Sequence, residues 1–138
     1  MDRRAFIATA GATLSASLGG CLASGLREDE YDIGMSANAF QPDTLEVAVG
    51  DTVVWGNNGS RGHTVTAYDA SLPEGAAFFA SGGFEETAAA REGWEDDGDG
   101  TLSPGTTFEH TFETVGTHDY FCIPHESAGM VGVIEVVE

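Results

Sequence analysis

The most informative stretch of this chain is Tyr120-Phe-Cys-Ile-Pro-His-Glu-Ser-Ala-Gly-Met130, close to its end. It places a thiol, an imidazole and a thioether within nine residues, those of Cys122, His125 and Met130. Soft sulfur ligands select copper over harder ions, and a trigonal His2Cys set with a weak axial Met is typical of blue-copper electron-transfer sites. The set needs a second histidine. His63, which lies 59 positions before Cys122, is the best candidate.

The composition limits the classes of protein to which the chain can belong. Its 138 residues are enough for one domain with a hydrophobic core. Asp and Glu number 23 against five Arg and no Lys, which gives a formal net charge of −18. Because such a surface repels a phosphate backbone, the sequence argues against DNA or RNA as a partner.

The acidity also suggests an environment. In dilute buffer, self-repulsion at this net charge destabilises a compact domain. In molar salt the screening length falls to roughly 3 Å, and most of that repulsion disappears. We therefore interpret the composition as adaptation to high salt, as in a halophilic organism, with an ordinary acidic protein as the alternative.

The first 30 residues predict export and membrane anchoring. Asp2-Arg-Arg-Ala-Phe-Ile7 resembles a twin-arginine export signal, and the weakly apolar run after it falls short of the roughly 20 residues that span a bilayer. Leu18-Gly-Gly-Cys21 resembles a lipobox, in which cleavage precedes a lipidated cysteine. We expect residues 1–20 to be a signal peptide and residues 21–30 to be a tether. Lipidated Cys21 would then hold the protein at the outer face of the cell membrane.

From Tyr31 onward, apolar and polar residues alternate with the period of β-strands. Gly50-Asp51 indicates a turn, and the strands on either side of it predict a hairpin. Short strands with Gly-rich turns favour an all-β, antiparallel sandwich of about seven strands over an α/β fold. The predicted strands cover residues 31–35, 45–49, 52–55, 63–68, 106–112, 116–122 and 131–137.

Residues 69–105 interrupt this rhythm and form an insertion. Good helix formers at residues 85–92 predict a short helix within it. Glu95-Asp-Asp-Gly-Asp-Gly100 has the acidic spacing of a calcium loop, but Thr106 stands where an EF-hand needs a glutamate. A solvated acidic loop is therefore the favoured interpretation.

The motifs together resemble blue copper proteins of the plastocyanin and halocyanin kind, in the cupredoxin family. The resemblance covers residues 31–138. It rests on Val47-Ala-Val-Gly-Asp-Thr-Val-Val-Trp55, on Gly62-His-Thr-Val65, and on the Cys-x2-His-x4-Met spacing within Tyr120-Phe-Cys-Ile-Pro-His-Glu-Ser-Ala-Gly-Met-Val-Gly132. Thr64 stands where many relatives have an asparagine that ties the two ligand loops together.

The resemblance implies a Greek-key β-sandwich that binds one type 1 copper ion. This plastocyanin-like domain would cover residues 31–138. It also implies the copper ligands, which are His63, Cys122, His125 and Met130. His110 and His118 are not expected to bind the metal, because four ligands complete the set without them.

The function implied is electron transfer, with copper cycling between Cu(I) and Cu(II) and electrons passing through the edge of His125. We expect a monomer that serves a redox donor and acceptor bound to the membrane. The alternative is copper storage or delivery, although such proteins tend to use Met-rich or His-rich tracts, and only three Met occur here. An enzyme is not expected, because a copper reductase needs an open coordination position or a second metal, and no Gly-x-Ser-x-Gly hydrolase motif occurs. We therefore predict neither catalytic nor substrate-binding residues.

Overall fold

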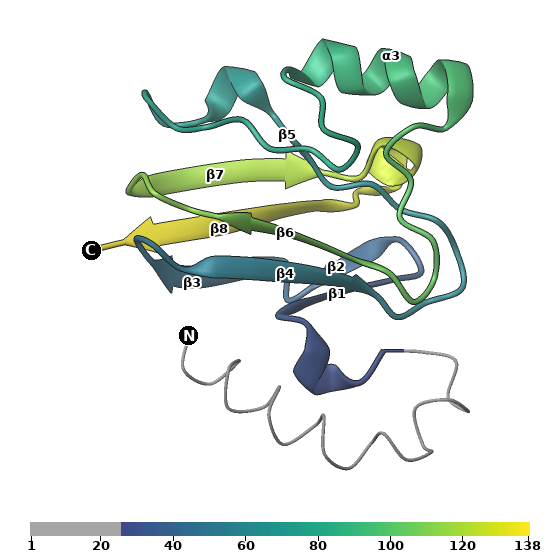
Figure 1. The fold of residues 1–138 in the computed structure, drawn as a ribbon, viewed down its shortest axis with the longest axis horizontal. Helices are drawn as coiled ribbons and strands as arrows, with labels where there is room; N and C mark the ends of the chain where they lie inside the picture. Colours follow the sequence, from purple (N-terminus) through teal and green to yellow (C-terminus); the bar gives the residue numbers. More distant parts are fainter. Residues whose placement is uncertain (1–25) are drawn as a thin grey trace.

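The computed structural model describes residues 26–138, and these fold into a sandwich of two β-sheets (Figure 1). The strands are β1 (Ile33–Ser36), β2 (Ala39–Gln41), β3 (Thr44–Ala48), β4 (Thr52–Asn57), β5 (Thr66–Ala67), β6 (Thr107–Thr111), β7 (Gly116–Phe121) and β8 (Val131–Val137). The helical segments are η1 (Glu28–Glu30), η2 (Asp69–Ser71), α3 (Thr87–Asp97) and η3 (Ile123–Ala128). One sheet has the order β2-β1-β4-β6 and the other the order β3-β8-β7-β5.

The predicted β-sandwich is confirmed, with two corrections. The strands described number eight rather than about seven, because residues 39–41 form a short strand beside β1. The sheets are mixed rather than antiparallel, since β1 runs parallel to β4 and β3 runs parallel to β8. A parallel pair needs a connection that crosses over. Here the chain leaves β1, passes through β3 in the other sheet, and returns to β4 in the same direction.

The predicted hairpin around Gly50-Asp51 is wrong, although the turn itself is present. Gly50 has φ of +92°, and the backbone N–H of Asp51 donates to Ala48 O at 2.9 Å. The two strands that the turn joins lie in different sheets, because β3 pairs with β8 while β4 pairs with β1 and β6. Val53 and Trp55 of β4 belong to the core, and Leu45 and Val47 of β3 pack against that core from the other sheet.

The core between the sheets is centred on Trp55, which is fully buried. Its ring packs against those of Phe79, Phe108, Phe112 and Tyr120, with centroids 5.3 to 6.3 Å apart. Aromatic pairs at these separations contribute roughly 0.5–1.5 kcal/mol each beyond the burial of their area. The aromatic cluster therefore fixes the spacing of the two sheets.

The helix in the insertion is longer than predicted. Residues 87–97 form α3, which lies outside the sandwich beside β5 (Figure 1). Thr87 joins the two elements, because its hydroxyl donates to Ala67 O at 2.8 Å. The helix continues through Asp97 and ends at Gly98, whose φ of +72° is the left-handed conformation typical of a C-terminal stop.

The predicted signal peptide and the lipidation site at Cys21 lie outside the described residues and stay predictions. Within residues 26–138, no helix has both the length and the apolar character needed to cross a bilayer.

Candidate metal centre

Three of the predicted ligands converge at one end of the sandwich. Nδ1 of His63 lies 3.6 Å from Sγ of Cys122, and Nδ1 of His125 lies 3.4 Å from the same sulfur. The three donor atoms all lie within 4.8 Å of one another. In residues 26–138, this is the only group of three or more such side chains whose donor atoms come together in this way.

The sequence predicted that His63 begins a strand. In the structure it instead lies in the segment before β5, outside any regular strand. Its backbone N–H donates to Leu102 O at 3.2 Å, and Leu102 N–H donates back to His63 O at 2.7 Å. The turn before it depends on Asn57, whose buried amide donates to Arg61 O at 2.7 Å and to Leu102 O at 2.8 Å. Sequence reasoning missed Asn57; its only signal was a polar residue at the end of an apolar strand.

Cys122, His125 and Met130 lie on the loop between β7 and β8, which folds back on itself through η3. The backbone N–H of Cys122 donates to Met130 O at 3.1 Å, and Met130 N–H donates to His125 O at 3.2 Å. His125 N–H in turn donates to Cys122 O at 3.2 Å. Each of the three residues is thus bonded through its backbone to the other two, while Cys122 and Met130 are fully buried in one apolar cluster. The loop is closed at both ends by strands of the same sheet.

Thr64 ties the two ligand segments together, although the resemblance implied an asparagine at this position. Its hydroxyl accepts a hydrogen bond from Ile123 N–H at 2.8 Å, and its own N–H donates to Sγ of Cys122 at 3.4 Å. The side chain is 1% exposed, so water does not compete for either bond. A hydroxyl is therefore sufficient to connect the two ligand segments.

The electrostatics of the centre favour neutral imidazoles and a protonated thiol before metal binds. Burial, with smaller contributions from His125 and Arg61, lowers the pKa of His63 to about 4. Burial and Arg61 also lower the pKa of His125. Burial raises the pKa of the Cys122 thiol, an effect that hydrogen bonds from Thr64 partly offset. Both imidazoles are therefore ready to ligate at neutral pH, whereas the thiol must release a proton.

The residues fit a copper ion. Imidazole nitrogen and thiolate sulfur bind metals such as zinc at about 2.0–2.3 Å, and at bond angles of about 105–120° such bonds put nitrogen and sulfur about 3.4–3.7 Å apart. The observed separations from sulfur are 3.6 and 3.4 Å. Two imidazoles, one thiol and a buried thioether are also the donor set typical of blue-copper sites.

Other residues named from the sequence lie elsewhere. His110 and His118 are not part of the convergent group; the ring of His110 stacks on Phe79 with centroids 4.7 Å apart, and Nε2 of His118 lies 2.9 Å from Thr114 O. The acidic stretch 95–100 lies partly in α3, and its carboxylates do not converge within the described chain. No structural feature therefore supports calcium binding there.

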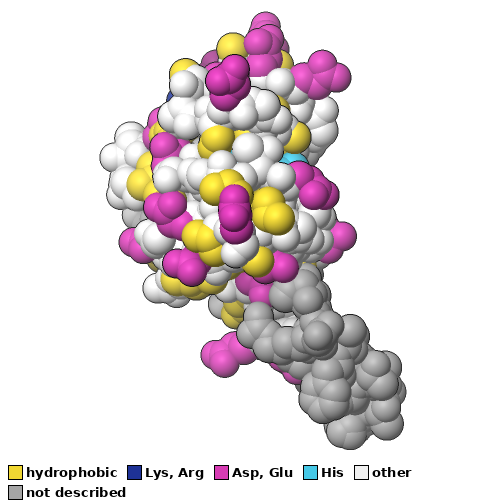
Figure 2. Space-filling model, turned by 90° about the vertical axis from the view of Figure 1, so that its left-hand side faces the viewer, with side chains coloured by type: hydrophobic (Ala, Val, Ile, Leu, Met, Phe, Trp, Pro, Cys, Tyr) yellow, Lys and Arg dark blue, Asp and Glu magenta, His cyan; other side chains and the backbone are white. Residues whose placement is uncertain are grey.

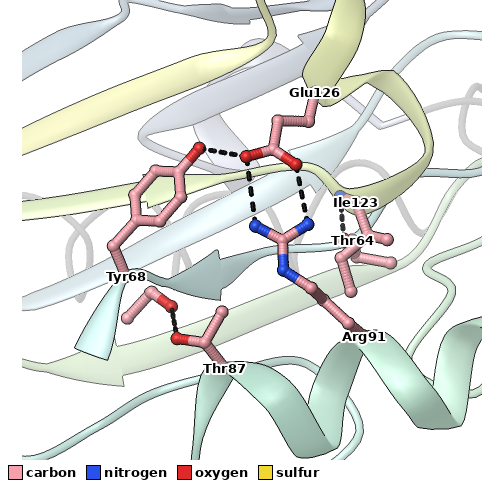
Figure 3. A network of polar contacts seen from close by, with 7 residues as sticks. Thr64, Tyr68, Thr87, Arg91, Ile123 and Glu126 are labelled. Carbon is pink, nitrogen blue, oxygen red and sulfur yellow. Dashed lines mark hydrogen bonds and ion pairs between the residues drawn. The ribbon is translucent and has the colours of Figure 1, made fainter. Parts of the chain in front are cut away.

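Next to the centre lies a polar cluster that sequence reasoning missed. Glu126, the residue after His125, accepts hydrogen bonds from Arg91 of α3 and from the hydroxyl of Tyr68 (Figure 3). The bond from Arg91 is the main reason why the pKa of Glu126 lies below its usual range. Burial and the bond to Glu126 raise the pKa of Tyr68. The sequence carried no signal for this cluster, because Arg91 and Glu126 are far apart along the chain.

Comparison with known proteins identifies the class to which this fold and site belong. Residues 28–137 match the family described as copper binding proteins, plastocyanin/azurin family. Plastocyanin of Scenedesmus fuscus is 33% identical over 100 residues, covering 72% of this chain and 88% of the relative. Chloroplastic plastocyanin of Fritillaria agrestis is 35% identical over 127 residues, covering 91% of this chain and 69% of the relative. The chain belongs to the plastocyanin/azurin family of copper-binding proteins, and its cofactor is one type 1 copper ion.

Solved structures agree on the fold. Oxidised plastocyanin of Dryopteris crassirhizoma matches with a TM-score of 0.50 and 28% identity, covering 75% of this chain and 97% of that one. Pseudoazurin of Methylobacterium extorquens matches with a TM-score of 0.54 and 19% identity, covering 77% and 73%. A copper-containing nitrite reductase of Thermus scotoductus also matches, with a TM-score of 0.53 and 24% identity, covering 77% of this chain but only 22% of its own. The last two likenesses, below 25% identity, concern the fold alone.

Proposed function

We propose that this protein is a one-electron carrier in which His63, Cys122, His125 and Met130 hold a single copper ion. The observation that carries the proposal is the convergence of two imidazole nitrogens on one buried thiol, from two separate segments of the chain. Bound copper supplies the Cu(I)/Cu(II) couple. The residues supply a pocket whose backbone hydrogen bonds hold the donors in nearly one arrangement whichever oxidation state is present.

The closed pocket supports a carrier rather than an enzyme. His63, Cys122 and Met130 are 0% exposed, while His125 is partly exposed. A substrate would need an open coordination position, whereas an electron needs only a short path to the surface. We therefore propose that the protein has no catalytic role and that electrons enter and leave through the edge of His125.

We also propose where the protein works. The motifs Asp2-Arg-Arg-Ala-Phe-Ile7 and Leu18-Gly-Gly-Cys21 support export and a lipid anchor at Cys21. The protein would then act as a monomer at the outer face of the cell membrane, passing electrons between membrane-bound redox proteins.

Visible and EPR spectra of the copper-loaded protein test the carrier proposal. We expect intense visible absorption in the wild type and its loss in Cys122→Ser, because the thiolate–copper bond produces it. His110→Phe, which changes a histidine outside the centre, is the matched control and should keep the spectrum. Persistence of the colour in Cys122→Ser would remove the thiolate from the site, and a colourless wild-type complex would favour copper storage or delivery.

A further inference from the structure

The insertion between β5 and β6 contacts the ligand loop through one bidentate ion pair. Nη1 of Arg91 lies 2.7 Å from Oε1 of Glu126, and Nη2 lies 3.2 Å from Oε2 (Figure 3). The two side chains are 37% and 32% exposed, so solvent screens the pair only in part. In this bidentate geometry, two parallel N–H···O hydrogen bonds fix the orientation of the arginine relative to the carboxylate, in addition to the attraction between their charges.

Two aromatic rings complete the surroundings of the pair. The guanidinium carbon of Arg91 lies 4.5 Å from the centroid of the Phe121 ring, within the range of a cation–π contact. Tyr68 also stacks on the Phe121 ring, with centroids 4.3 Å apart, and its hydroxyl donates to Oε2 of Glu126 at 2.6 Å. Both oxygens of the carboxylate therefore have donors, and the arginine is held in place by contacts other than charge.

The pair is continuous with the ligands through short stretches of backbone. Phe121 immediately precedes Cys122, and Glu126 immediately follows His125. The carbonyl of Glu126 accepts from Gly129 N–H at 2.9 Å, and the carbonyl of His125 accepts from Met130 N–H at 3.2 Å. Fixing the Glu126 side chain therefore restricts the turn that presents His125, the ligand with the most exposed position.

Charge is the second consequence of the pair. An unpaired carboxylate one residue from a ligand would favour the more positive oxidised copper by Coulomb attraction. Arg91 places a positive charge directly against that carboxylate, so the two contributions at the metal largely cancel. The same contact thus affects both the position of His125 and the field around it.

We propose that Arg91 is a positioning residue for the copper centre, holding the Glu126 turn against α3 and balancing the carboxylate charge beside His125. The proposal rests on the proposed function, because it concerns the copper that these ligands bind. A purely structural role, in which the pair only attaches α3 to the sandwich, is the competing explanation.

The reduction potential distinguishes the two explanations. In Arg91→Met the carboxylate is left uncompensated, so the potential should fall; in Glu126→Gln the guanidinium is left uncompensated, so the potential should rise. The double variant should return toward the wild-type value. Both shifts should shrink in molar salt, where the screening length is roughly 3 Å. Arg27→Met is the matched control, since Arg27 pairs with Asp29 and Glu30 in η1 and should not shift the potential.

A measurement on the metal-free protein tests the positional part separately. Hydrogen exchange of the Gly129 and Met130 amides should become about two- to fivefold faster in Arg91→Met, the range expected for loss of a partly exposed ion pair. Arg91→Lys keeps the positive charge but not the bidentate hydrogen bonds. Its reduction potential should therefore lie closer to the wild-type value than its amide exchange rates do.

The outcomes separate failure of this inference from failure of the proposed function. A wild-type protein that binds no copper, or binds it without thiolate colour, contradicts the carrier proposal, while the exchange experiment still tests the Arg91 contact. A blue wild type whose Arg91→Met and Glu126→Gln variants shift the potential in the same direction, or leave it unchanged, overturns the inference and leaves the carrier proposal intact.

Discussion

The Cys122 thiol is the residue on which the chemistry of the centre depends. It is fully buried, faces the Nδ1 atoms of His63 and His125, and accepts a hydrogen bond from Thr64 N–H at 3.4 Å. Hydrogen bonds to a ligating sulfur tune the electron density of the metal. Thr64 therefore serves two purposes, because its N–H donates to the sulfur while its hydroxyl accepts from Ile123 N–H and links the two ligand segments.

His110, a partly buried histidine away from the ligands, offers a test of how burial opposes its protonation. Burial, with a smaller contribution from the nearby His118, lowers the pKa of His110. As pH falls below about 6.5, the unfolded chain takes up a proton at this residue that the folded protein resists, so the free energy of unfolding should fall. Denaturant unfolding of the copper-loaded protein between about pH 8 and pH 5 measures this slope.

The control is His110→Phe, which keeps an aromatic ring beside Phe79 and Phe112. Its unfolding free energy should depend less on pH than that of the wild type over the same range. An equal slope in the two proteins would show that His110 titrates alike in the folded and unfolded states.

Among the elements, the insertion contributes most to the centre beyond the ligand loop itself. Leu102 pairs with His63 through two backbone hydrogen bonds, and Ser81 N–H donates to Val65 O at 2.7 Å. Arg91 adds the contact with Glu126. Strand β5 is only two residues long, so its sheet does not provide hydrogen-bond partners for the backbone of the segment before it. The insertion provides these partners instead. We infer that it shapes both ligand segments.

Helix α3 should depend on its C-terminal glycine. Gly98 has φ of +72°, a conformation that costs an ordinary residue about 1–2 kcal/mol. A Cβ there would meet no atom closer than 3.9 Å, so strain and not a steric clash is expected. We predict that Gly98→Ala lowers the free energy of unfolding by about 1 kcal/mol, measured by denaturant unfolding.

Gly98→Asn is the matched comparison, because asparagine tolerates the left-handed conformation better than alanine. It should cost less than Gly98→Ala although its side chain is larger. Equal losses in the two variants would mean that the position is sensitive to any side chain and that backbone strain is not the cause.

The whole molecule carries a large excess of negative charge. Carboxylates are scattered over the face shown in Figure 2, with hydrophobic side chains between them. Exposed apolar residues include Val49, Val115 and Val137. The last turn of α3 adds Glu95, Asp96 and Asp97 and has no basic residue, although a helix C-terminus favours positive charge. Self-repulsion and the helix dipole therefore both oppose folding at low ionic strength.

Salt should relieve this repulsion. We predict that the free energy of unfolding of the copper-loaded protein rises as NaCl is increased from about 0.01 M to about 1 M, where the screening length falls from roughly 30 to roughly 3 Å. Denaturation by urea, which adds no charge, measures the effect. KCl should act like NaCl, since screening depends on ionic strength and not on the cation.

Neutralising the end of α3 provides the control. A variant with Glu95→Gln, Asp96→Asn and Asp97→Asn should be more stable than the wild type in dilute buffer and should gain less from added salt. A wild type whose unfolding free energy is unchanged by NaCl would contradict the interpretation of the acidic surface as an adaptation to high salt.

Sequence alone predicted the donor set and determined most of the strands. Three of the four donors lie within nine residues, so their spacing is a local property, and the chemistry of thiol, imidazole and thioether selects copper. The alternation in residues 131–137 likewise reports burial directly, because side chains on a strand point to opposite faces in turn. His63 was predicted because the donor set lacked one ligand and because Gly62-His-Thr-Val65 carries part of the resemblance to blue copper proteins.

Tertiary structure alone decided which sheet each strand joins, and therefore the parallel pairs and the absence of a hairpin at Gly50. It also decided that Leu102, Asn57 and Arg91 support the ligand segments. These are contacts between residues distant in sequence. The alternation of apolar and polar residues shows that one face of a strand is buried, but it does not show which element packs against that face. The element that covers a buried face depends on the order of the strands in the sheets, and this order results from the folding of the complete chain.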